Sequence, residues 1–281
     1  MAAGTSSRFV PLSVEKPKGL LEVKGEILIE RQIKQLKSAG INDITIVVGY
    51  KAEMFSYLKE KYQVDIVINE DYYRYNNTSS IIRVIDRLNN TYICSSDNYF
   101  PDNVFKFSST QSFYSSLYAN GITNEYCLQI DNNDNIINVS IGGQDSWYMI
   151  GHVFFNEEFS LKFKKILKEE YKNEETKNEY WEDVYIRHIN ELPAMKINKY
   201  NHEDIKEFDS IDELRLFDTT YLNNTRSSVI KEISIYFNTQ EENIHSFKNL
   251  KSQKCALNFE FKFNEKTYIY NEIAQTKISE K

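Results

Sequence analysis

The sequence predicts an α/β protein built on a doubly wound, mixed but mainly parallel sheet, with a small β-rich tail at its C-terminal end. Helix and strand patterns alternate along about the first 100 of the 281 residues, which is typical of parallel strands joined by helices. Alternating stretches in the middle of the chain predict antiparallel strands. A polar stretch at residues 222–228 then separates a short tail that is rich in strand patterns.

The first part of the chain reads as three helices and three strands in alternation. Apolar residues recur at helical spacing from Ile27 to Ala39, and Gly40 is a typical helix stop. Taken in order, the predicted helices cover residues 27–39, 51–62 and 79–88, and the predicted strands cover residues 43–48, 64–69 and 92–95. Such a sheet binds its ligands at the carboxyl ends of its strands, and the third strand runs directly into Asp97.

The second part of the chain changes character. Residues 126–130 and 136–141 alternate around an Asp131–Asn135 turn, which predicts a hairpin added to the sheet. Helices are predicted at 157–171 and 181–192, and a strand at 195–200. These patterns place one domain at residues 1–222 and a separate β-rich segment at residues 229–281.

Composition limits the classes of function. The net charge of −7 argues against a general nucleic-acid-binding protein, which needs a basic face. The sequence has no apolar run of about 20 residues, so it predicts no membrane span. The cysteines are odd in number and lack metal-binding spacing, which favours thiols in a reduced, cytoplasmic compartment; they are Cys94, Cys127 and Cys255.

The start of the chain has the composition of a phosphate-binding loop. Small residues from Ala2 to Ser7 let backbone N–H groups gather around an anion without interference from side chains. Arg8 and Lys18 add positive charge to this loop. A loop that holds a triphosphate and directs two cations at it predicts phosphoryl or nucleotidyl transfer.

Beyond its composition, this region carries an ordered set of motifs. They are Ala-Ala-Gly-Thr-Ser-Ser-Arg-Phe at 2–9, Pro-Leu at 11–12, Lys-Pro-Lys-Gly-Leu at 16–20, Glu-Arg-Gln at 30–32, Gly-Tyr at 49–50 and Tyr-Asn-Asn-Thr-Ser-Ser at 75–80. The set resembles the signature of nucleotidyltransferases with a Rossmann-like, glycosyltransferase-A-like fold, and is most similar to bacterial CTP:phosphocholine cytidylyltransferases. The similarity runs to about Asp218.

The resemblance implies roles for the nucleotide-binding residues. It places Lys18 beside the α-phosphate, where a solvated surface lysine is the alternative interpretation. The residues that it implies around CTP are Ala2, Ala3 and Gly4 at the nucleotide, Thr5, Ser6, Ser7 and Arg8 around the β- and γ-phosphates, and Asn77 and Ser80 at the cytosine. Polar loop residues without such a role are equally common, so Asn77 and Ser80 remain open.

The resemblance also implies a Mg²⁺ site. Asp97 and Asp209 match the two metal-binding aspartates of the family, and each follows a strand pattern. Carboxylates and phosphate oxygens are the ligands that Mg²⁺ prefers. Turn formation or helix capping is the alternative role of each residue, and Asp212 and Asp204 compete with Asp209.

A further group of residues falls where the family builds its acceptor pocket. A quaternary ammonium is recognised by aromatic faces and carboxylates, at about 0.5–2 kcal/mol for each ring. The residues expected to supply these groups are Glu125, Tyr126, Trp147, Tyr180, Trp181 and Glu182. Packing of the aromatic side chains in the core is the alternative.

The chain departs from the family pattern at both ends. The family has a buried strand before Ala-Ala-Gly where this sequence has Met1, so we expect the central strand of the sheet to be mostly absent, through an altered or incomplete start. Ser6 replaces the usual glycine and is strained if that position needs a positive φ. Residues 247–270 resemble the opening strands of choline-kinase-like enzymes, which some bacteria fuse to cytidylyltransferases. We expect a remnant of two or three strands without kinase activity, and the resemblance allows for a fused or partner kinase.

The sequence therefore predicts a CTP-dependent cytidylyltransferase that acts on phosphocholine with Mg²⁺. The alternatives are UTP as the nucleotide, or another acceptor such as 2-aminoethylphosphonate, phosphoethanolamine, inositol phosphate or a sugar 1-phosphate. A non-catalytic nucleotide-binding protein is the alternative from a different class.

Overall fold

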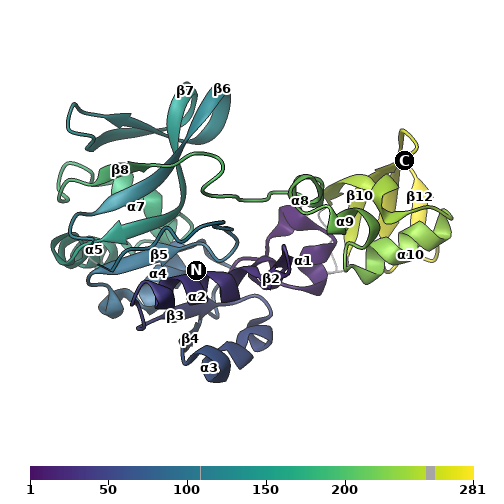
Figure 1. The fold of residues 1–281 in the computed structure, drawn as a ribbon, viewed down its shortest axis with the longest axis horizontal. Helices are drawn as coiled ribbons and strands as arrows, with labels where there is room; N and C mark the ends of the chain where they lie inside the picture. The colour runs from purple at the N-terminus through teal and green to yellow at the C-terminus, as the bar shows by residue number, and fades with distance from the viewer. Residues whose placement is uncertain (108, 251–256) are drawn as a thin grey trace. The chain divides into compact units, whose positions relative to one another are not determined.

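The structure is a computed structural model that describes residues 1–107, 109–250 and 257–281 (Figure 1). Contacts between residues divide the chain into two compact units. Unit 1 comprises Met1–Gly4 and Ile29–Lys206, and unit 2 comprises Thr5–Leu28 and Glu207–Lys281. This division differs from the boundary drawn from the sequence at residues 222–228, because the segment that carries Arg8 and Lys18 packs with the C-terminal residues.

Unit 1 begins with the predicted alternation of helices and strands. Strands β3 and β4 pair in parallel, from Thr45 opposite Asp65 to Val48 opposite Ile68. The elements of this part are α2 (Leu28–Ser38), β3 (Thr45–Val48), α3 (Tyr57–Tyr62), β4 (Asp65–Ile68), α4 (Thr78–Arg83) and β5 (Thr91–Cys94). Each lies inside or within a residue of its predicted range.

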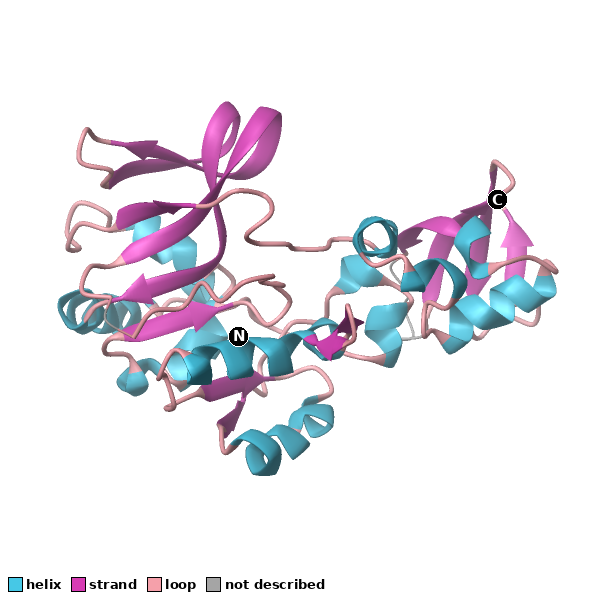
Figure 2. Cartoon of the chain, in the orientation of Figure 1, coloured by secondary structure: helices cyan, strands magenta, loops and turns pink. Residues whose placement is uncertain are grey.

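A second sheet of unit 1 has the strand order β5-β7-β6-β8. It contains β6 (Phe113–Ile130), β7 (Ile136–Phe155) and β8 (Lys196–Lys199), with β6 and β8 parallel and the other pairs antiparallel. The β6–β7 hairpin is far longer than predicted, since register shifts interrupt the alternation that marks its strands. Its outer part exposes Ile122 and Ile141 to solvent and forms the long magenta arm in Figure 2.

Three helices follow the hairpin and close the main core of unit 1. They are α5 (Glu157–Glu170), α6 (Glu174–Lys177) and α7 (Trp181–Arg187). Helix α5 starts at Asn156, whose Oδ1 accepts a hydrogen bond from the N–H of Phe159 at 2.9 Å, as an N-cap residue does. Phe159 and Phe163 on α5 pack on Phe155 of β7. These aromatic residues join the sheet to the helices.

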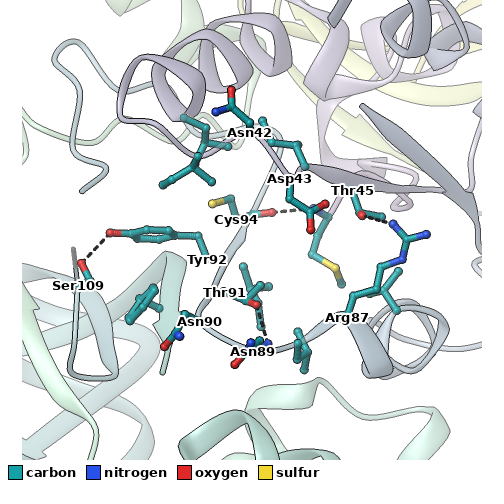
Figure 3. A pocket seen from close by; sticks show the side chains of 18 of the residues that line it. Asn42, Asp43, Thr45, Arg87, Asn89, Asn90, Thr91, Tyr92, Cys94 and Ser109 are labelled. Carbon is teal, nitrogen blue, oxygen red and sulfur yellow. Dashed lines mark hydrogen bonds between the residues drawn. The ribbon is translucent and has the colours of Figure 1, made fainter. Parts of the chain in front are cut away.

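The two sheets of unit 1 are separated where the resemblance places a central strand. The N–H of Ala2 donates to Val47 O at 2.7 Å, and the amino group of Met1 donates to Cys94 O at 2.7 Å. Met1 and Ala2 therefore bridge one end of β3 and β5. The remaining space is a groove of about 890 Å³, which Figure 3 shows between the β5 residues Thr91–Cys94 and Thr45.

Unit 2 combines a short N-terminal segment with the C-terminal residues. Its first part contains α1 (Leu12–Glu15), β1 (Glu22–Val23) and β2 (Glu26–Ile27). Three helices follow residue 206, namely α8 (Ile211–Phe217), α9 (Thr220–Asn223) and α10 (Ser228–Tyr236). An antiparallel sheet in the order β12-β11-β10-β9 ends the chain, with β9 at His245–Asn249, β10 at Asn258–Phe263, β11 at Lys266–Asn271 and β12 at Ile278–Glu280.

The tail is thus larger than the two or three strands predicted. Phe259, Phe261 and Tyr270 of its sheet are buried, and Phe237 after α10 packs on Phe261. Residues 251–256, which include Cys255 and part of the kinase-like stretch 247–270, lie outside the described residues. In the parts of the chain that are described, no helix is long and apolar enough to cross a membrane.

Candidate active site

The start of the predicted nucleotide loop is held firmly in unit 1. Ala2 and Ala3 are buried, and Ala3 O accepts a hydrogen bond from the N–H of Tyr50 at 3.1 Å. A Cβ on Gly49 would lie 2.9 Å from Ala3 O and closer still to Tyr72. The Gly49-Tyr50 motif therefore lets the backbone of the β3 end approach the loop, and Gly4 follows with open space around it.

The turn that follows belongs to unit 2 and is strained at Ser6. Ser6 has φ 49° and ψ 45°, in the left-handed region where glycine is preferred. Its carbonyl accepts a hydrogen bond from the N–H of Phe9 at 2.9 Å. The strain expected from the sequence is therefore present, at a cost of about 1–3 kcal/mol. Thr5, Ser7 and Arg8 are exposed around it.

Arg8 and Asp209 contact each other within unit 2. Arg8 Nη1 donates to Asp209 Oδ2 at 2.7 Å, and the two side chains are 75% and 40% exposed. The predicted phosphate-binding cation thus neutralises a predicted metal-binding carboxylate. An exposed pair of this kind contributes about 0–1 kcal/mol, so a phosphate or a metal ion can compete for either partner.

The two competitors of Asp209 have local structural roles. Asp212 accepts a hydrogen bond from Arg215 Nη1 at 3.2 Å and from the N–H of Ser246 at 2.7 Å. Asp204 accepts from the N–H of Asn201 at 2.8 Å in a turn. Both carboxylates therefore shape the backbone around them.

Lys18 is not a solvated surface lysine. It is 6% exposed, and its Nζ lies 5.7 Å from the centre of the Phe9 ring. A buried ammonium group of this kind requires anions or aromatic faces nearby. Phe9 is itself buried, so the motif that supplies Arg8 also supplies one wall around Lys18.

Asp97 lies in a turn of unit 1 that neighbouring groups fix on both sides. Ser95 N–H donates to Gly151 O at 2.7 Å, and Ser96 N–H donates to Met1 O at 3.1 Å. Gln32 Nε2 donates to the carbonyls of Ser95 and Asn98, both at 2.8 Å. Gln32 thus orients the turn, a role that sequence reasoning missed although the Glu-Arg-Gln motif contains it.

Asn77 and Ser80 make internal contacts. Asn77 Oδ1 accepts from the N–H of Trp181 at 2.7 Å, and its Nδ2 donates to Glu182 Oε2 at 3.2 Å. Ser80 is buried, and its Oγ accepts from Asn69 Nδ2 at 2.9 Å. Asn77 therefore fixes the start of α7, and a role of either side chain at the cytosine stays a prediction.

Glu182 stands at the centre of the predicted acceptor residues. Besides its bond to Asn77, it accepts a hydrogen bond from Tyr114 Oη at 3.1 Å. Burial, with a smaller contribution from the neighbouring carboxylate of Asp183, raises the pKa of Glu182 to about 7, although its own backbone N–H, Asn77 and Tyr114 act to lower it. A cation that arrived here would favour the ionised form of Glu182.

The aromatic residues of this region have different surroundings. Trp181 is 3% exposed and packs on Phe155 and Phe163 in the core. Core packing was the alternative to a place on the surface of the acceptor pocket. Trp147 is partly buried and packs on that same core. Tyr180 is 47% exposed. Tyr180 therefore presents aromatic surface, the Trp147 ring has Lys199 Nζ 5.7 Å from its centre, and the Trp181 ring is buried.

The remaining two acceptor candidates lie on β6. Tyr126 Oη donates to Asp183 Oδ1 at 2.9 Å, and burial, followed by this bond, raises the pKa of Tyr126. Glu125 is exposed, and its N–H donates to Thr123 Oγ1. The structure thus brings Tyr126 to the α7 carboxylates and leaves Glu125 on the strand surface. Tyr114 was missed because its partner Glu182 is distant in sequence.

The predicted metal-binding aspartates lie one in each unit. No cluster of three or more His, Cys, Asp or Glu side chains in the described ranges could hold a metal. Asp97 and Asp209 each offer one carboxylate, a hard oxygen ligand. That chemistry suits Mg²⁺, which is commonly held by one or two carboxylates together with substrate phosphates and water.

Known proteins are similar to this chain over most of its length. Residues 1–102 match the model of the MobA-like NTP transferase domain. Choline-phosphate cytidylyltransferase of Streptococcus pneumoniae is 34% identical over 215 residues, which are 76% of this chain and 93% of the relative. 2-aminoethylphosphonate cytidylyltransferase of Lancefieldella rimae is 33% identical over 231 residues, 81% of this chain and 94% of the relative.

Solved structures show the same fold. The CTP:phosphocholine cytidylyltransferase of Streptococcus pneumoniae superposes with a TM-score of 0.75 at 34% identity, covering 78% of this chain and 96% of that one. The inositol-1-phosphate CTP transferase of T. maritima superposes with a TM-score of 0.58 at 15% identity, covering 83% and 94%. The second likeness concerns the fold alone.

Proposed function

Because the chain belongs to the nucleotidyltransferase family of the choline-phosphate and 2-aminoethylphosphonate cytidylyltransferases, we propose that it transfers CMP from CTP to phosphocholine, giving CDP-choline and pyrophosphate. One combination carries the proposal. The same N-terminal segment holds a buried Lys18 and an exposed Arg8, and a relative with this activity matches three quarters of the chain. A cytoplasmic location, where nucleotides are available, is part of the proposal.

The reaction needs no general base. The phosphate of phosphocholine is largely ionised at neutral pH, since its second pKa is about 6. One of its oxygens forms a bond to the α-phosphorus of CTP while the bond to the bridging oxygen breaks, and pyrophosphate leaves with that electron pair. Lys18 stabilises the charge that develops on the α-phosphate, and Arg8 holds the β- and γ-phosphates.

Asp97 and Asp209 would hold Mg²⁺ in this proposal. The ion, when bound, neutralises the charge of the triphosphate. Arg8 leaves Asp209 for the phosphates when the nucleotide arrives, which exposes the carboxylate for the ion. The weak, exposed Arg8–Asp209 pair supports this exchange because breaking it costs little.

The trimethylammonium group of phosphocholine would rest on the aromatic faces of Trp147 and Tyr180, with Glu182 as its counter-charge. A cation on an aromatic face gains about 0.5–2 kcal/mol. Trp181 supports this surface from the core, and Tyr126 fixes Asp183 beside Glu182. Glu125 would contribute its negative charge from the strand surface.

The test is pyrophosphate release from CTP and Mg²⁺ with phosphocholine, 2-aminoethylphosphonate or glucose 1-phosphate, and with UTP replacing CTP. Release with CTP and phosphocholine is expected, and Lys18→Ala should abolish it while the protein stays folded. Release with 2-aminoethylphosphonate alone would keep the nucleotide chemistry and change the acceptor. Calorimetric CTP binding without any release would favour a non-catalytic protein.

A further inference from the structure

Glu15 lies between Arg8 and Lys18 in sequence and is bound to the start of α10. Its Oε1 accepts hydrogen bonds from Ser227 Oγ at 2.7 Å and from the N–H of Val229 at 3.2 Å. Its Oε2 accepts from the N–H of Ser228 at 3.0 Å. The first N–H groups of a helix have no partner within the helix, and a carboxylate there is favoured by the helix dipole. Glu15 thus supplements Ser227, the N-cap residue of α10, whose Oγ accepts a hydrogen bond from the N–H of Ile230.

A second set of bonds holds the chain on the other side of Lys18. The N–H of Lys24 donates to Asp218 Oδ2 at 2.7 Å, and Tyr221 Oη donates to Glu22 O at 2.7 Å. Asp218 is 1% exposed, and its two donors at Thr220 together with Lys24 hold its pKa below the usual value although burial opposes this. Two anchors, at Glu15 and at residues 22–24, therefore flank Lys18.

The segment between the anchors has little structure of its own. Between the anchors lies one 3-10 turn, Lys18–Leu20. The elements beside it are equally short, since α1 has four residues and β1 and β2 have two residues each. Elements this short are not stable alone, because they form too few hydrogen bonds to offset the lost chain entropy. The position of Lys18 therefore depends on the residues to which the anchors bind, all of which follow residue 217.

We infer that the C-terminal residues of unit 2 position the phosphate-binding loop, with Glu15 and Asp218 as positioning residues on either side of Lys18. This inference rests on the proposed function, in which Arg8 and Lys18 meet the nucleotide phosphates. Residues 218–229, at the border between the predicted domain and the tail, then serve the phosphate-binding loop. A loop that is ordered before CTP binds avoids the entropic cost of ordering it at each turnover.

The experiment compares Glu15→Ala and Glu15→Gln with Glu242→Gln, an exposed carboxylate of the same unit. Glu15→Ala should raise the KM for CTP about tenfold or more and lower kcat, with the phosphocholine KM unchanged. Glu15→Gln keeps an acceptor oxygen and should lie between Glu15→Ala and the wild type. Hydrogen exchange of residues 9–24 should speed up in Glu15→Ala while that of α5 stays the same.

The outcomes separate the two proposals. An active wild type with unchanged CTP kinetics and exchange in Glu15→Ala overturns the positioning role and leaves the proposed function intact. A wild type that neither binds CTP by calorimetry nor releases pyrophosphate overturns both. Equal changes in the KM of CTP and of phosphocholine would point to a general disturbance of the site and also contradict the inference. Asp218→Asn should repeat the Glu15→Ala pattern, which guards against a single variant that fails to fold.

Discussion

Trp181 stacks on Tyr114 with ring centroids 5.9 Å apart and planes 15° from parallel. The same Tyr114 donates to Glu182. One aromatic pair thus joins the core of unit 1 to the carboxylate at the centre of the acceptor residues. Packing of Trp181 sets the position of Glu182, which gives the core a direct effect on the site.

Trp181→Ala should mainly destabilise the protein. Removing a buried tryptophan costs about 3–5 kcal/mol, because a cavity is left in the core. Trp147→Ala should cost less in stability and should raise the KM for phosphocholine. Urea unfolding and acceptor kinetics of both variants check this contrast. A Trp181→Ala protein of normal stability with a higher KM would restore Trp181 to the acceptor surface.

Glu182 should make stability fall as pH rises. Its pKa is about 7 in the folded protein against an ordinary value of 4.5, so the folded state binds its proton more tightly than the unfolded chain does. The stability it contributes is full below about pH 4.5 and is lost as the pH rises through 7. Unfolding free energies of wild type and Glu182→Gln between pH 5 and pH 8 measure this. Parallel pH profiles would contradict the prediction.

His152 should act in the opposite direction. It is buried, and burial lowers its pKa to about 3 from 6.5, while its Nε2 lies 2.8 Å from Ser115 Oγ. The unfolded chain gains a proton that the folded protein does not, so stability decreases as the pH falls below about 6.5. His152→Gln should weaken the dependence of the unfolding free energy on pH between pH 7 and pH 5. His202→Gln, at an exposed histidine, should leave that dependence unchanged.

Asp209 and Asp212 should differ in their response to metal. Asp209→Asn should raise the Mg²⁺ concentration for half-maximal activity about tenfold or more, since a carboxylate ligand is lost. Asp212→Asn should leave that concentration unchanged and lower the thermal stability, because its bonds to Arg215 and Ser246 are weakened. Mg²⁺ titrations and melting curves decide between them. A metal shift in Asp212→Asn instead would exchange their roles.

The groove between β3 and β5 should accept an added strand. Six residues of alternating valine and isoleucine fused before Met1 would cover apolar lining and remove the buried ammonium group, whose pKa burial lowers. Every kcal/mol gained raises Tm by about 2–4 °C in a domain of this size. Six serine and glycine residues are the matched control, and an equal Tm for both fusions would speak against strand addition.

Local patterns predicted the helices and strands of unit 1 well. Helical spacing and a glycine stop located α2, and β-branched runs located β3 and β4 within two residues. These signals come from neighbouring residues, so no tertiary information is needed. The long β6–β7 hairpin was underestimated, because bulges and exposed residues such as Ile122 break the alternation on which the prediction depends.

Contacts between distant residues could not be predicted in this way. Asn77 bonds Glu182 across 105 residues, and Glu15 reaches Ser227 across 212. Neither pair carries a local signal. The role of Trp181 was equally open, since a tryptophan in the first turn of a helix can face the core or the solvent. Packing decides this, and packing depends on the whole fold.

The groove beside β5 has a consequence for handling the protein. Among the described residues, β3 pairs with β4 and β5 with β7, and Met1 and Ala2 bond only one end of their other edges, so the rest of both edges faces the groove. Open edges of this kind recruit extended segments of other chains through backbone hydrogen bonds. Storage at high concentration should therefore promote slow cross-chain pairing, and dilute preparations should keep their monodispersity longer.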